Sequence, residues 1–126
     1  MIEFKDKDST RENPFGPCLG YYREIVRFFE ESNRMVERFV SKIPENDKRQ
    51  EIYLWNDTST NPGMRIEFHV YPTEDRWDSI TYSVKQKNNK LTFKVSRMRT
   101  DEEKKFSDEV SALNCVLEFY NKILEG

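Results

Sequence analysis

Histidine is the side chain that most often carries proton-transfer chemistry, and this 126-residue chain contains one, His69. Glu67 and Tyr71 stand two residues to either side of it, so the three side chains share one face if the segment is a strand. A general base needs a hydrogen-bonding partner within reach, and a carboxylate at that spacing would supply one. This is a weak case for catalysis, and a histidine exposed at the surface or at an interface is the better interpretation.

The two cysteines, Cys18 and Cys115, offer no stronger chemistry. Cys115 is expected on the polar side of a C-terminal helix with no histidine near it in sequence, and we interpret it as an unused exposed thiol. Cys18 precedes the first helix and is expected to pack. A zinc site would need more cysteine and histidine ligands than the chain contains, and four glycines leave little room for a phosphate-binding loop. The sequence therefore predicts no metal, no cofactor and no enzymatic activity.

A different set of side chains is more informative, because alternation places aromatic and basic residues together on one face of a predicted sheet. The members of this set are Tyr53, Trp55, Arg65, His69, Tyr71, Lys85 and Lys94. A sheet face with aromatic rings and several cations suits the docking of a protein partner or of a second copy of the chain. It would also suit the stacking of single-stranded nucleic-acid bases, which is the alternative function. The plainer interpretation is a solvated face whose rings shield the strand edges.

The element that must position this face is a predicted hairpin over residues 80–97. Apolar and polar residues alternate on both sides of Asn88-Asn89, and asparagine accepts a positive φ well enough for a two-residue turn. This turn places Val84 opposite Phe93, with the apolar side chains of both strands on one face. The hairpin therefore predicts which side of the sheet the helices cover and which side they leave free.

Two more strands are predicted before the hairpin, over residues 51–56 and 64–71, because apolar and polar residues alternate in both. Pro72 ends the second strand. Residues 57–63 and 73–78 are expected to be loops.

A first helix is predicted over residues 19–42, where apolar residues recur at helical spacing, and Pro44 follows its end. Tyr21, Phe28 and Met35 repeat every seven residues on the flank of its main apolar stripe. The apolar surface is therefore wider than contact with one sheet requires. Either the helix packs on the sheet and on a second helix at once, or this flank binds another chain.

A second helix is predicted to begin at Thr100, because Thr100-Asp101-Glu102-Glu103 matches a capping box. Apolar residues then follow at steps of about three or four, as on one face of a helix. They are Phe106, Val110, Leu113, Leu117, Tyr120 and Leu124.

The order of these elements predicts an α+β two-layer sandwich. A four-stranded antiparallel meander sheet would carry the N-terminal and C-terminal helices on one face. Residues 18–126 are expected to form a single domain, and residues 1–17, broken by prolines and a glycine, an irregular and flexible arm. Ile2-Glu3-Phe4 is the one part of the arm that would suit a strand added to a sheet edge.

The composition limits the classes of partner that the chain is expected to bind. The formal net charge of -2 argues against a generic nucleic-acid or polybasic membrane binder, because both need a positive field. No window of the sequence approaches a signal peptide or a membrane span, and a reduced, cytoplasmic protein is the simplest expectation. We therefore predict a small non-enzymatic interaction protein of the inhibitor, immunity or accessory type, which docks through the free sheet face or the flank of the first helix.

Overall fold

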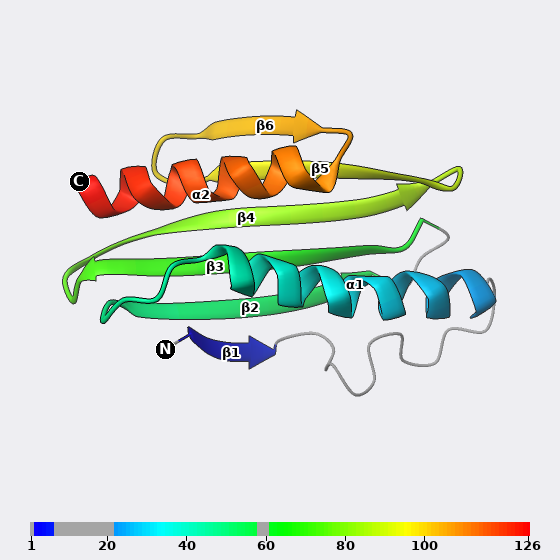
Figure 1. Cartoon of the computed structure of the whole chain (residues 1–126), viewed down its shortest axis with the longest axis horizontal. Helices are drawn as coiled ribbons and strands as arrows, with labels where there is room; N and C mark the ends of the chain where they lie inside the picture. Colours follow the sequence, from blue (N-terminus) through cyan, green and yellow to red (C-terminus); the bar gives the residue numbers. More distant parts are fainter. Residues whose placement is uncertain (1, 7–21, 58–60) are drawn as a thin grey trace.

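The computed structural model describes residues 2–6, 22–57 and 61–126, with the side chains of residues 27–56 and 61–126. Six strands and two helices make up the described chain. In order they are β1 (Ile2–Asp6), α1 (Tyr22–Lys42), β2 (Arg49–Asp57), β3 (Gly63–Thr73), β4 (Arg76–Lys87), β5 (Lys90–Arg97), β6 (Glu102–Phe106) and α2 (Glu109–Glu125). Both helices lie on the same side of one sheet (Figure 1), so the predicted two-layer α+β sandwich is confirmed.

The strands lie side by side in the order of the sequence, from β1 at one edge to β6 at the other. β2 to β6 pair antiparallel through short connections, as a meander requires, whereas β1 pairs parallel with β2 after a crossover that includes α1. The predicted number of four strands is wrong, because β1 and β6 extend the sheet at its two edges. For residues 2–6, the expected irregular arm is instead this edge strand. Residues 7–21, including Cys18 and Tyr21, lie outside the described residues.

The β4–β5 hairpin has the predicted turn and register. Asn88 and Asn89 adopt φ angles of 53° and 61°, the left-handed region that a tight two-residue hairpin turn needs at both positions. Lys87 pairs with Lys90 across the turn, and Val84 lies opposite Phe93. The alternation of the two strands therefore puts their apolar side chains on the helix side of the sheet.

The β3–β4 connection is shorter than the predicted charged loop over residues 73–78. β3 runs past Pro72 to Thr73, which pairs with Arg76 at the start of β4. The register shifts between Val70 and Thr73, where proline has no N–H group to donate to the ladder. Trp77 therefore belongs to a strand, although the sequence prediction assigned it to a loop.

The predicted start of the second helix at Thr100 is wrong. Asp101, which would occupy the first helical position, has a φ of 55° and belongs to the turn that leads into β6. Helix α2 begins at Glu109, where the carboxylate of Asp108 accepts a hydrogen bond from the Ser111 backbone at 2.8 Å. The local capping pattern competes with pairing of residues 102–106 against β5, and the tertiary pairing prevails.

The shorter α2 also changes which of its side chains are buried. The buried set is Ala112, Leu113, Cys115, Val116, Phe119, Tyr120 and Ile123. Val110, expected on the buried stripe, is 69% exposed. Cys115, expected on the polar side, is only 4% exposed, and burial raises the pKa of its thiol.

The flank of α1 does not offer a docking surface at Phe28 or Met35. Both side chains are 1% exposed and belong to the core under α1, so the prediction that they bind another chain is wrong. The wider apolar surface is instead used in packing on the sheet and beside α2, to which Arg38 is joined by an ion pair with Glu109 at 2.8 Å. Neither α1 nor α2 has the length and apolar composition that crossing a membrane would require.

Candidate docking surface

The outer face of the sheet is the face opposite the two helices. Alternation along the strands places on it every residue of the predicted aromatic and basic set, because their sequence neighbours Ile52, Leu54, Ile66, Phe68, Val70 and Val84 are buried on the helix side. The outer-face members are Tyr53, Trp55, Arg65, His69, Tyr71, Lys85 and Lys94. Their placement follows the sequence analysis, and their role in binding remains a prediction.

Five rings on this face stack into one continuous row, which we call the aromatic column: Tyr53, Trp55, His69, Tyr71 and Trp77. Ring centroids of Tyr53 and Trp55 are 6.3 Å apart, and those of Tyr53 and His69 are 4.7 Å apart. Trp77 lies 4.8 Å from His69 and 6.0 Å from Tyr71. Adjacent rings are inclined by 22–40°, so they lie closer to parallel than to edge-to-face.

A guanidinium group covers each end of the aromatic column. Arg65 lies 4.3 Å from the ring centroid of Trp55, and Arg49 lies 4.4 Å from that of Tyr71. Each contact is a cation–π interaction, worth about 0.5–1 kcal/mol at an exposed site. The column therefore runs from one arginine to the other and crosses β2, β3 and β4.

Glu51 holds two rings of the column and one of its arginines by hydrogen bonds. Its carboxylate is 5% exposed and accepts hydrogen bonds from Tyr71 Oη at 3.2 Å, Tyr53 Oη at 3.4 Å and Arg49 Nη2 at 3.0 Å. Burial, and next the negative charge of Glu51, raise the pKa of the Tyr71 phenol. This carboxylate therefore fixes the orientation of two rings and of one covering arginine.

His69 is part of the column and not of an open catalytic site. Its Nε2 atom lies 2.6 Å from Glu67 Oε1, so the partner expected from sequence is present. The imidazole is held between the rings of Tyr53 and Trp77, and its side chain is 13% exposed. Glu67 therefore orients an imidazole that is packed on both faces, which suits a structural or interface role better than proton transfer.

Four outer-face residues of the site were not predicted from the sequence: Arg49, Glu51, Trp77 and Lys105. Arg49 precedes the predicted start of its strand at residue 51. Trp77 and Lys105 were assigned to a loop and to a helix, because β4 begins earlier and α2 later than predicted. The alternation of the sequence breaks before Ile80, because the inward position is occupied by Asp78, which is buried in an ion pair with Arg97. No local pattern therefore indicated that Trp77 belongs to the strand. Glu51 stood at the first position of a predicted strand, where a carboxylate is expected in solvent and not in a buried hydrogen-bond network.

A lane of small hydroxyl side chains, Ser79, Thr81 and Ser83 on β4, runs beside the aromatic column. The outer face is hollowed along this lane. One hollow of about 420 Å³ lies between Trp55 and Arg65 on one side and Ser83 and Lys85 on the other.

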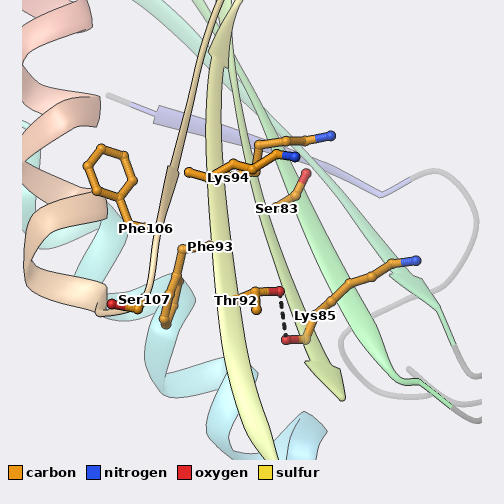
Figure 2. Close-up of a pocket in the computed structure, with 8 residues that line it drawn as sticks. Ser83, Lys85, Thr92, Phe93, Lys94, Phe106 and Ser107 are labelled. Atoms are coloured by element: carbon orange, nitrogen blue, oxygen red, sulfur yellow. Dashed lines mark hydrogen bonds between the residues drawn. The ribbon is translucent and has the colours of Figure 1, made fainter. Parts of the chain in front are cut away.

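A larger hollow of about 580 Å³ lies across β4, β5 and the end of β6 and shares Ser83 and Lys85 with the first. Its other lining residues are Thr92, Phe93, Lys94, Lys105, Phe106 and Ser107. Figure 2 shows the lysines on one side of the strands and the two phenylalanine rings on the side of α2. The hollow therefore joins a basic rim on the outer face to two apolar rings on the helix side, Phe93 and Phe106, at the end of β6.

In the part of the chain that the structure describes, no three His, Cys, Asp or Glu side chains gather as a metal site would require. Comparison with known proteins finds no protein-family model, no curated protein and no solved structure that matches the chain. Any functional interpretation therefore depends on the surface itself.

Proposed function

We propose that this chain is a small non-enzymatic interaction module that docks a protein partner through the outer face of its sheet. The aromatic column is the observation that carries the proposal. The chain already has an aromatic core between its sheet and its helices. The column places further rings on the opposite face, and of these His69, Tyr71 and Trp77 have no described helix or strand packed against them.

The composition of the column favours protein docking. Tyrosine, tryptophan and arginine are the residue types that most often dominate the binding energy of protein interfaces. Ring stacking and the hydrogen bonds to Glu51 hold the column in one arrangement before a partner arrives. Binding by a surface that is already ordered loses less conformational entropy than binding by a mobile one.

The stacking geometry counts against the nucleic-acid alternative. Single-strand binders stack bases on aromatic side chains and need ring faces that a base can reach. Here the faces of the inner rings of the column contact one another, and the end rings, Trp55 and Tyr71, are each covered by an arginine. A protein partner would contact the ring edges of His69, Tyr71 and Trp77 and the cations Arg65, Lys85 and Lys94, which flank the column on the outer face.

Site-specific photo-crosslinking in the cells that produce the protein tests the proposal. A photoreactive phenylalanine at Thr81 or Ser96, both central on the outer face, is expected to give a protein adduct. The same group at Glu37 on α1 or Glu118 on α2, both exposed on the helix layer, serves as the matched control. Equal adducts from both layers, or none from the outer face, would contradict the proposal.

A substitution in the column then links the adduct to the rings. Trp77→Ala is expected to reduce the adduct yield from Ser96, while the helical circular dichroism signal stays unchanged. Val110→Ala, which truncates an exposed apolar side chain on α2, is expected to leave the yield as it is. An unchanged yield in Trp77→Ala would show that the rings serve the fold alone.

A further inference from the structure

Four basic side chains of the outer face lie close together across β3, β4, β5 and β6. Arg65 pairs with Ser83, Ser83 with Lys94, and Lys94 with Lys105. Lys85 stands one step further along β4, opposite Thr92. Arg65, Lys85, Lys94 and Lys105 therefore surround Ser83, where the two hollows meet, and we call this arrangement the cationic row.

The described residues compensate the charge of the cationic row only in part. Lys94 and Lys105 are direct cross-strand neighbours, and like charges in that position destabilise a sheet. Among the described residues, Glu103 is the one carboxylate paired with the row, at 3.6 Å from Lys94. Among the described side chains of the outer face, cations outnumber carboxylates, although the chain has a net charge of -2. The cations are Arg49, Arg65, Lys85, Lys87, Lys90, Lys94 and Lys105, and the carboxylates are Glu51, Glu67 and Glu103.

On the side away from the Asn88-Asn89 turn, the next row of the sheet limits how far a matching anion can extend. Glu67, Thr81, Ser96 and Glu103 lie side by side one step along the strands, so a carboxylate stands at each end of that row. In the opposite direction, toward the Asn88-Asn89 turn, the next outer-face residues are the cations Lys87 and Lys90. A long polyanion that followed the strands away from the turn would leave the cationic row and meet these carboxylates. A compact group of negative charges would not, because it would stay within the hollows around Ser83.

We propose that the cationic row and its hollows bind a short acidic segment of the partner protein, with an apolar side chain among the acidic ones. The carboxylates would be placed between Arg65 and Lys85 on one side and Lys94 and Lys105 on the other, with Ser83 and Thr92 as hydroxyl donors. The apolar side chain would reach past the end of β6 to Phe106, which is partly buried. This inference rests on the proposed docking function and names the chemistry of its partner.

Capped pentapeptides test the inference directly. A Glu-Glu-Leu-Glu-Glu peptide is titrated into the ¹⁵N-labelled protein, and amide shifts are expected at Ser83, Lys85, Lys94 and Lys105. A Gln-Gln-Leu-Gln-Gln peptide is the uncharged control and should cause no shifts. Raising NaCl from about 50 mM to about 500 mM should weaken binding of the acidic peptide strongly, because exposed charges are screened. Absence of shifts, or equal shifts with both peptides, would overturn the inference.

Variants of the row separate it from general surface charge. Lys85→Gln and Lys105→Gln are each expected to weaken binding by about two- to five-fold, as for one exposed ion pair. Lys48→Gln removes an exposed lysine from the turn before β2 and should leave the Kd unchanged. An equal loss of affinity in Lys48→Gln would overturn the assignment to the row.

Two further probes identify other anions. Tighter binding of single-stranded oligothymidylate than of the acidic peptide would overturn the assignment in favour of nucleic acid. Binding of tripolyphosphate without binding of the peptide would replace the partner segment by a free phosphorylated ligand. If neither peptide binds but Thr81 and Ser96 still give protein adducts, the acidic-segment inference fails and the proposed docking function stands.

Discussion

The two faces of the sheet both carry aromatic rings, and the rings are arranged differently on each. Under the helices, Phe39 meets Phe68 at 87° and Tyr82 at 68°, and all three side chains are fully buried. On the outer face, neighbouring rings are inclined by 40° or less and are only partly buried. Phe68 and Tyr120 are the stacked exception inside.

The difference follows from what surrounds the rings. In a core, side chains approach from the sheet and from two helices, and edge-to-face contacts fill that volume well. On an open face, the neighbours come from the same sheet, so upright rings meet side by side and stack. The inner cluster is therefore expected to determine stability, and the outer column to retain ring edges for another molecule.

Truncating one ring on each face of the sheet is expected to give the largest difference in the free energy of unfolding. Phe39→Ala is expected to lower the free energy of unfolding by about 3–5 kcal/mol, because a fully buried phenylalanine is lost. Trp77→Ala removes a partly buried ring and is expected to cost about 1–2 kcal/mol. Urea denaturation measures both values. Equal losses would break the comparison, since the column would then be a second core.

The free energy of unfolding is next expected to depend on alkaline pH through the buried phenol of Tyr82. Burial, reinforced by the charge of Glu109, raises the pKa of its phenol far above the usual value near 10. The unfolded chain therefore releases this proton at lower pH than the folded one. The stability contribution is complete below about pH 10 and falls by about 1.4 kcal/mol per pH unit above it.

Tyr82→Phe should remove that part of the pH dependence. The measurement is the urea midpoint of both proteins between about pH 8 and pH 11. Parallel curves for the two proteins would show that the phenol ionises in the folded state as readily as in the unfolded one.

Hydroxyl removal sharpens the comparison at neutral pH. Tyr82 Oη is buried and has no hydrogen-bond partner in the described structure, so Tyr82→Phe is expected to be neutral or stabilising by up to about 1 kcal/mol. Tyr71 Oη donates to Glu51, so Tyr71→Phe is expected to cost about 1 kcal/mol. Thermal unfolding of the pair measures the difference. The opposite order would indicate that a buried water satisfies Tyr82.

The reactivity of a cysteine on each side of the sheet gives a comparison that changes the stability of the protein least. In a Cys18→Ser background, Cys115 is expected to react with an aromatic disulfide reagent only after unfolding, because its side chain is buried. A cysteine introduced by Ser83→Cys on the outer face should react in the folded protein. Rapid labelling of native Cys115 would mean that the helix layer opens readily.

The central strands of the sheet were predictable from the sequence, and the edge strand β6 was not. The alternation in β2 to β5 and the Asn88-Asn89 turn are local signals, and they placed the seven predicted side chains on one face. β6 depends instead on pairing with β5, and the Thr100–Glu103 segment carries a capping pattern that competes with this pairing. Local patterns alone do not decide between the two outcomes.

The candidate site was predictable to the same extent. The alternation of each strand predicts which residues face outward. It does not predict the column, because the column depends on distances between rings that lie on three different strands. The cationic row was hidden for a similar reason. Lys105 joins the row because β6 pairs with β5, and the sequence analysis had placed Lys105 in a helix.

The sequential order of the strands has a consequence for how the molecule is made. From β2 onward, each strand pairs with the one synthesised just before it, so the sheet can grow hairpin by hairpin as the chain leaves the ribosome. The aromatic column is complete once β4 has paired, whereas the cationic row must await β6. Docking through both would therefore select chains whose synthesis has passed Phe106.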